Sequence, residues 1–68
     1  MFGFTEQEQL IFRYVCKGYT NIEIGNKLNI SKHTARAHVS SILRKLNVKR
    51  RIEVAYIAGL HAIELDID

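Results

Sequence analysis

The sequence predicts an all-α fold, a compact four-helix helix-turn-helix domain. Three observations support this prediction. The 68 residues include no proline and only four glycines, so few positions interrupt a helix. A Thr-x-x-Glu pattern, which can cap a helix N-terminus, occurs twice, and apolar residues then recur at helical spacing. Because a chain this short holds one core at most, we expect a single domain over residues 1–68, with its core at about 4–62.

The first helix is expected to begin after Thr5 and to end at Gly18. The Thr5 hydroxyl can accept from the Glu8 amide while the Glu8 carboxylate reaches back, which forms a capping box. Glycine at position 18 suits the left-handed residue that follows many helices. The apolar residues between these caps recur at helical spacing: Leu10, Ile11, Tyr14 and Val15.

A short second helix is expected almost at once, because Thr20 and Glu23 repeat the capping box. Gly25 within it leaves room for the close approach of another helix. Residues 29–30 then form a turn. The apolar contacts of this helix are Ile24 and Leu28.

Ser31 can cap the third helix, which is expected over about residues 31–46. A short helix, a turn and a longer amphipathic helix form a helix-turn-helix, whose second helix lies in the DNA major groove. The side of this helix opposite its apolar stripe, which we call the outward arc, carries cations and small side chains. We also count Ser41 among these small outward side chains. Small side chains let the backbone come close to DNA, and the arginines then reach bases or phosphates. The inward stripe is Ala35, Val39, Ile42, Leu43 and Leu46, and the outward arc is His33, Arg36, Ala37, Ser40 and Arg44.

A fourth helix is expected from about Arg50 to Ala62, after a break at residues 47–49. This helix has two apolar sides, and whichever of them stays exposed on so small a domain calls for a partner.

The charges are segregated along the chain. The net charge is +3, yet the window between Ile24 and Ile52 holds eight Lys or Arg residues and no acid. A surface that serves only solubility mixes the two signs. The segregation therefore favours a docking face for a polyanion such as double-stranded DNA.

Other classes of function lack sequence support. No nucleophile–base constellation, carboxylate pair or phosphate-binding glycine loop occurs, so an enzyme is not expected. Cys16 has no partner for a disulfide and no metal-ligand cluster occurs, so we expect neither metal nor cofactor. Cys16 is expected in or near the core, and His38 is interpreted as a structural residue at the edge of the buried stripe. No apolar run is long enough for a membrane span, and a single cysteine suits a reducing cytoplasm.

An ordered set of residues across the predicted helices matches one known pattern. The set is Thr5, Glu8, Gly18, the run TNIEIGNKLNIS at 20–31, Thr34, Arg36, His38, Ile42, Lys45, Leu46, Val48 and Arg51. With these residues the chain resembles the LuxR/FixJ-type helix-turn-helix domain of bacterial transcription regulators over about residues 4–62. Arg50 departs from that pattern, since a capping Ser or Asn is common there, and a ragged start of the fourth helix is expected.

The resemblance implies the effector domain of a transcription regulator, dimeric on double-stranded DNA, with the third helix in the groove and the fourth at the dimer contact. It also assigns Val54, Ala55 and Ala58 to the core and implies a location in the bacterial cytoplasm, at the nucleoid when bound to DNA. The other apolar side is thereby left as an exposed stripe, which consists of Ile52, Tyr56, Leu60 and Ile63, with Gly59 beside them. We hypothesise an isologous homodimer through this stripe, and the alternative is a neighbouring domain that covers it. An N-terminal receiver or ligand-sensing domain outside this chain and RNA polymerase are further candidate partners. By this resemblance the base-reading positions fall on Arg36, Ala37 and Ser40. The backbone contacts that it implies are Thr20, Ser31, Lys32, Thr34, Lys45 and Lys49. We add His33 and Arg44 to the backbone contacts because they lie on the outward arc.

Two other interpretations share the helix-turn-helix. A sigma-factor-type promoter-binding module has the same two-helix core, but it ends with the recognition helix, whereas here a further helix follows Asn47. A degenerate helix-turn-helix used only for protein contacts would not need a basic face free of acids.

Overall fold

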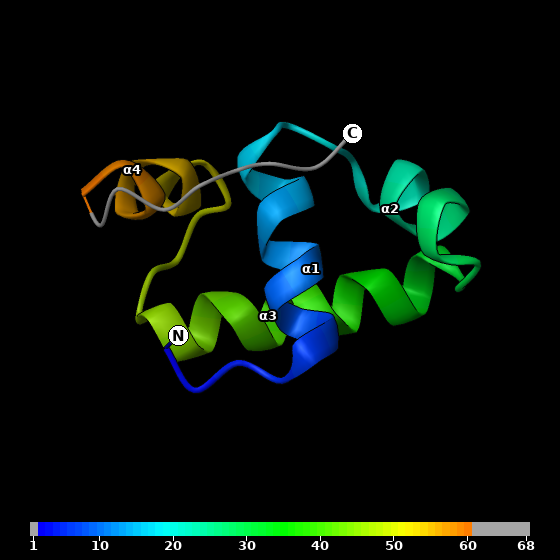
Figure 1. Cartoon of the computed structure of the whole chain (residues 1–68), viewed down its shortest axis with the longest axis horizontal. Helices are drawn as coiled ribbons and strands as arrows, with labels where there is room; N and C mark the ends of the chain where they lie inside the picture. Colours follow the sequence, from blue (N-terminus) through cyan, green and yellow to red (C-terminus); the bar gives the residue numbers. More distant parts are fainter. Residues whose placement is uncertain (1, 61–68) are drawn as a thin grey trace.

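Four α-helices joined by short turns make up the computed structural model, which describes residues 2–60 (Figure 1). The all-α prediction is confirmed, and the turn of the helix-turn-helix lies between the second and third helices. The helices are α1 (Glu6–Cys16), α2 (Asn21–Leu28), α3 (Lys32–Leu46) and α4 (Ile52–Leu60).

Both predicted capping boxes are present. At α1, the Thr5 hydroxyl accepts from the Glu8 amide at 3.1 Å, and the Glu8 carboxylate accepts from the Thr5 amide at 2.9 Å. At α2, Thr20 and Glu23 repeat this geometry at 3.1 and 2.8 Å. Each box satisfies two amides that the start of a helix leaves without partners.

The first three helices end in the same way. Each is followed by a residue with positive φ: Gly18 at 89°, Asn29 at 57° and Asn47 at 58°. In each case the next amide bonds back to a carbonyl five residues earlier, as in the Schellman motif. These bonds run from Tyr19 N to Tyr14 O, from Ile30 N to Gly25 O and from Val48 N to Leu43 O, at 3.1, 3.0 and 3.0 Å.

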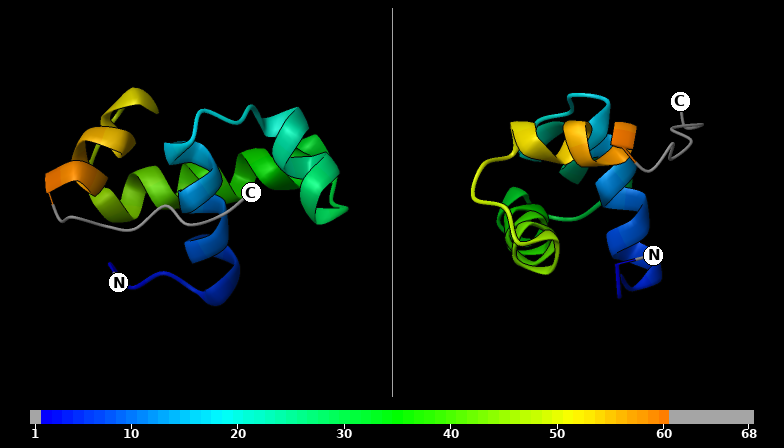
Figure 2. Two further views of the ribbon diagram at one scale, coloured as in Figure 1. Left: turned by 45° about the horizontal axis from the view of Figure 1, so that its top comes forward. Right: turned by 90° about the vertical axis from the view of Figure 1, so that its left-hand side faces the viewer.

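Helix α1 crosses α3, with α2 and α4 toward opposite ends of α3 (Figures 1 and 2). α3 packs on α1 and α2, while α4 packs on α1. The turn before α3 passes close to α2, because a Cβ at Gly25 would lie 2.7 Å from the Ile30 carbonyl oxygen. The buried apolar core comprises Phe4, Ile11, Phe12, Tyr14, Val15, Ile24, Ala35, Val39, Ile42, Val54 and Ala58.

Helix α4 begins at Ile52, two residues later than the sequence predicts. The amides of Glu53 and Val54 bond to the carbonyls of Arg50 and Arg51, at 3.0 and 3.1 Å, so these arginines form a tight turn ahead of the helix. The Glu53 carboxylate accepts from the Lys49 amide at 3.3 Å and so takes over part of the capping role. The predicted end at Ala62 lies outside the described residues.

The prediction that Ala55 is a core residue is wrong. Val54 and Ala58 are buried, whereas Ala55 is exposed. Residues four apart share a helix face, and Ala55 is rotated by about 100° from Val54. It therefore joins Ile52, Tyr56, Gly59 and Leu60 on the outer side of α4.

Cys16 lies at the edge of the core, as predicted. It is half-buried, and its thiol lies 3.9 Å from the Val54 carbonyl oxygen as a weak donor. Burial raises the pKa of Cys16 to about 11, so the group remains a thiol near neutral pH. A protonated thiol is a poor nucleophile, which argues against a redox role.

Candidate nucleic-acid interface

The outward arc of α3 points away from the core, as predicted. Its N-terminal neighbour Lys32 is exposed as well, so one surface runs along most of the helix. The inward stripe is buried or half-buried on the other side. The exposed surface, which we call the α3 outer face, consists of Lys32, His33, Arg36, Ala37, Ser40 and Arg44.

The basic side chains at the start of this face have no partner in the part of the chain that the structure describes. Within residues 2–60, the side chains of Lys32, His33 and Arg36 form no ion pair or hydrogen bond. The first turn of α3 also holds no acid, in contrast to α1 and α2. Cations at a helix N-terminus oppose the helix dipole and lower stability. Their placement therefore favours binding of an external anion over a structural role.

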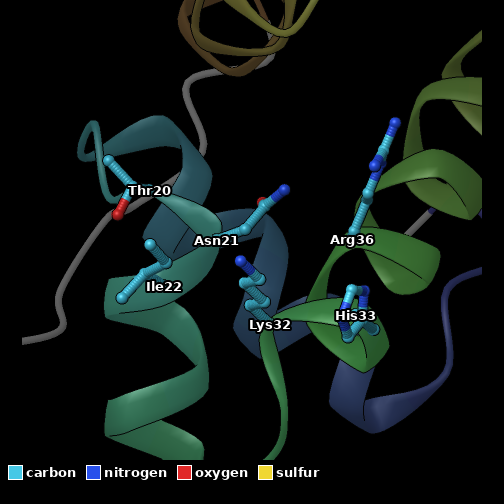
Figure 3. A pocket seen from close by; sticks show the side chains of 6 residues that line it. All are labelled: Thr20, Asn21, Ile22, Lys32, His33 and Arg36. Atoms are coloured by element: carbon cyan, nitrogen blue, oxygen red, sulfur yellow. The ribbon is translucent and has the colours of Figure 1, made fainter.

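A pocket of about 390 Å³ joins the N-termini of α2 and α3 (Figure 3). Three lining side chains are basic, and all three (Lys32, His33 and Arg36) also belong to the α3 outer face, so the pocket and this face are continuous. Helix N-termini attract anions through their free amides and their positive dipole ends. The pocket is lined by Thr20, Asn21, Ile22, Lys32, His33 and Arg36.

The capping residues leave amides available beside this pocket. The box at α2 uses the amides of Thr20 and Glu23, and those of Asn21 and Ile22 have no partner within the described residues. At α3 the Ser31 hydroxyl accepts from the Thr34 amide at 3.0 Å, while Ser31 and Thr34 stay exposed. Two helix starts thus present donors in one region.

Lys45, expected at the DNA backbone, is held by α1. Its ammonium donates to the Glu8 carboxylate at 2.6 Å and to the Gly3 carbonyl oxygen at 3.1 Å. Ser41 donates to the other Glu8 oxygen at 2.7 Å, so counting Ser41 among the outward residues is wrong. The Ser41 side chain is half-buried because it bonds to this carboxylate, which is only 5 % exposed.

This network stabilises the charged form of Glu8. The hydrogen bond from Lys45, followed by those from the Thr5 amide and Ser41, lowers the pKa of Glu8 to about 2 against the opposing effect of burial. The local pattern reveals Glu8 only as a capping residue. Its partners lie 33 and 37 residues away, which sequence spacing cannot bring together.

Arg51 forms a second long-range connection that the local sequence pattern misses. Its guanidinium donates to the Asn21 side-chain oxygen at 2.7 Å and to the Tyr19 carbonyl at 2.6 Å. Burial lowers the pKa of Arg51, although a guanidinium stays charged at physiological pH. The start of α4 is thereby tied to the start of α2.

The predicted apolar stripe of α4 is exposed. Ile52, Tyr56 and Leu60 are 76 %, 68 % and 64 % exposed, and Ala55 and Gly59 complete the surface. We call these five residues the α4 outer face. Ile63, also predicted in the stripe, lies outside the described residues.

Residues 2–60 contain no group of three His, Cys, Asp or Glu side chains placed to hold a metal ion. Among the same residues, no helix is long and apolar enough to cross a bilayer.

Residues 3–58 match the family described as "Bacterial regulatory proteins, luxR family" (GerE). The chain is 42% identical over 55 residues to a "Glycerol metabolism activator" of Pseudomonas putida, covering 81% of this chain and 25% of that protein. It is 40% identical over 57 residues to "Response regulator protein VraR" of Staphylococcus aureus (strain Mu3 / ATCC 700698), covering 84% of this chain and 27% of that protein. The VraR of Staphylococcus saprophyticus gives the same identity and coverage.

The chain therefore belongs to the LuxR family of bacterial regulatory proteins, and the resemblance seen in the sequence is confirmed. The family consists of helix-turn-helix domains of DNA-binding transcription regulators rather than enzymes. The chain spans about a quarter of the length of the relatives described above.

Proposed function

We propose that this chain binds double-stranded DNA sequence-specifically as the effector domain of a transcription regulator, with α3 in the major groove. The observation that carries this proposal is the α3 outer face, where exposed cations flank small side chains and have no ion pair or hydrogen bond with the side chains or backbone of residues 2–60. Ala37 and Ser40 let the helix backbone approach the base edges, and Arg36 is long enough to reach a base as a charged donor. The proposed base-reading residues are Arg36, Ala37 and Ser40.

The proposed phosphate contacts lie partly on the α3 outer face and partly around it. We propose that the pocket between α2 and α3 receives a phosphate, which their N-terminal amides and basic side chains favour. Lys45 is expected to contribute less than the other cations, because Glu8 already holds its ammonium. The proposed backbone contacts are Thr20, Ser31, Lys32, His33, Thr34, Arg44 and Lys49, with Lys45 as the weaker member.

Selection of duplexes from a random pool, followed by binding titrations at several salt concentrations, tests this proposal. The logarithm of the affinity should fall with log[salt] by about 0.9 for each phosphate neutralised. Arg36→Ala should cost about 1–3 kcal/mol of binding and relax the preference at one base position. Arg44→Ala should weaken all sequences about equally. Equal, sequence-independent losses for both variants would refute the division into reading and positioning residues.

Homodimerisation through the α4 outer face and Ile63 is a second part of the proposal. An exposed stripe of three large apolar side chains at one helix face suits a two-fold, self-complementary contact. Sedimentation of the Tyr56→Glu variant provides the test, since a charge in this contact should abolish self-association. Unchanged association would leave a neighbouring regulatory domain as the cover of this face, in line with the receiver or sensing domain that the resemblance implies.

The alternative interpretations fit less well. A sigma-factor-type module ends at its recognition helix, whereas α4 follows α3 here. A helix-turn-helix kept for protein contacts alone has no need of unpaired cations at the α3 N-terminus, where the helix dipole disfavours them. Contact with RNA polymerase is compatible with the proposed function.

A further inference from the structure

Arg51 lies between two functional parts of the molecule. Its carbonyl accepts from the Val54 amide at 3.1 Å in the first turn of α4, and the next residue, Ile52, opens the α4 outer face. Its guanidinium reaches in the other direction, to Tyr19 in the link between α1 and α2 and to Asn21, the first residue of α2. One half-buried residue thus connects the fourth helix to the start of the helix-turn-helix.

The two acceptors of Arg51 flank Thr20. One guanidinium nitrogen bonds to the Tyr19 carbonyl, and the other bonds to the Asn21 side chain. Thr20 between them is the N-cap of α2, and both Thr20 and Asn21 line the basic pocket. The Tyr19 ring also packs on Tyr14 at 4.9 Å, but that contact holds the side chain rather than the backbone carbonyl. Arg51 therefore fixes the backbone from which the free amides of α2 project.

We propose that Arg51 is a positioning residue for DNA binding: its guanidinium holds the first turn of α2 so that Thr20 and the nearby amides meet a DNA phosphate. This inference rests on the proposed DNA-binding function. Arg51 acts through Tyr19 and Asn21, because both of its terminal nitrogens are engaged with them. To bond to both acceptors at once, the side chain needs a planar fork with two separate donors, and the single ammonium of lysine cannot reproduce this geometry.

The test compares Arg51→Lys, Arg51→Gln and Asn21→Ala with the control Arg50→Gln. Arg50 is the adjacent, exposed arginine, and its only described partner is Glu53 at 3.4 Å, so Arg50→Gln reports the effect of losing one charge at this place. Affinity is measured by fluorescence anisotropy on a duplex selected by the wild-type chain, in a salt series. Circular dichroism fixes a temperature at which each variant is folded, and Arg51→Lys and Asn21→Ala carry the test should Arg51→Gln fail to fold.

We expect Arg51→Lys to bind the duplex about tenfold more weakly than the wild type, because it loses a hydrogen bond to a charged group. Its salt slope should equal that of the wild type. Arg51→Gln should lose at least as much affinity and clearly more than Arg50→Gln. The double variant Asn21→Ala with Arg51→Lys should be little weaker than Arg51→Lys alone, because the two residues act as one unit.

Two results would overturn the inference. If Arg51→Lys binds like the wild type while Arg51→Gln reduces the salt slope by about 0.9, then Arg51 contacts a phosphate directly. If the folded variants all bind like the wild type, the first turn of α2 does not depend on Arg51. A wild-type chain that binds no duplex even in dilute buffer would instead refute the proposed function itself, and this inference with it.

Discussion

The two ends of α3 carry similar charges but use them differently. At the N-terminal end, Lys32, His33 and Arg36 are exposed and lack side-chain partners within residues 2–60. At the C-terminal end, Lys45 is held by the buried Glu8 of α1. A run of basic residues in the sequence therefore does not reveal which cations are available to DNA, because their availability depends on their partners within the protein.

The helix dipole makes the contrast sharper. Lys45 lies in the last turn of α3, where a cation is favourable, and also gains an ion pair. Lys32 lies in the first turn, where a cation is unfavourable. Lys45 therefore contributes to stability, whereas Lys32 is placed at some cost to stability and its ammonium has no partner among residues 2–60.

Lys45→Met is expected to give the largest effect on stability. Removing one partner of a buried ion pair costs about 3–5 kcal/mol, and the Lys45 side chain is 34% exposed, so we expect a loss of about 2–3 kcal/mol in the free energy of unfolding. Urea denaturation at neutral pH measures this loss. The matched control is Lys32→Met, which should change the free energy of unfolding by less than about 0.5 kcal/mol.

The same two variants should reverse their order in DNA binding. Lys32→Met should reduce the salt slope by about 0.9, as expected for one lost phosphate contact, while folded Lys45→Met should keep most of the slope. Equal losses by the two variants in both measurements would show that the ends of α3 do not differ in the way described above.

Acid unfolding should give a smaller, pH-dependent effect at the Glu8 network. The pKa of Glu8 in the folded protein is about 2, below its ordinary value of 4.5, so the folded state binds this proton less readily than the unfolded state. The stabilisation is complete above about pH 4.5 and disappears as the pH falls toward 2. Urea denaturation across this range should show that Glu8→Gln lacks this component of the pH dependence.

Glu23→Gln is the matched control, because Glu23 holds the same position in the capping box of α2 but is exposed and, within residues 2–60, forms no bond to a lysine or serine side chain. Its pH profile should retain the acid-dependent loss seen in the wild type. If Glu8→Gln and the wild type lose stability in parallel from pH 4.5 to 2, the network around Glu8 does not carry the charge stabilisation assigned to it.

Features set by neighbouring residues could be predicted from the sequence. The capping boxes at Thr5 and Thr20, the left-handed Gly18 and the Ser31 cap depend on contacts within one turn. The outward direction of Arg36 and Ser40 follows from helical periodicity, since the opposite side of α3 is clearly apolar.

Features set by tertiary packing were missed for physical reasons. Ser41 is a small polar residue beside the boundary of the apolar stripe, and only the distant Glu8 determines that it turns inward. The resemblance places Ala55 in the core, and periodicity cannot correct this, because α4 is apolar on almost every side and its buried face is not distinguished. The Arg51 bridge joins residues 30 and 32 positions apart, beyond the range of any local pattern.

The smallest expected effect concerns the asparagines that flank α3. Asn29 and Asn47 have nearly the same left-handed backbone, with φ of 57° and 58°, and both are exposed. Glycine adopts this conformation without strain, so Asn29→Gly and Asn47→Gly should each raise the free energy of unfolding by about 0.5 kcal/mol. Thermal and urea unfolding of both variants measure the gain. The two asparagine variants are expected to gain the same free energy of unfolding, whereas the Lys32 and Lys45 variants are expected to lose different amounts. This outcome would mean that the ends of α3 differ in their side-chain charges rather than in their backbone. A clear gain at one cap only would instead mean that backbone strain differs between the ends and contributes to their different stability.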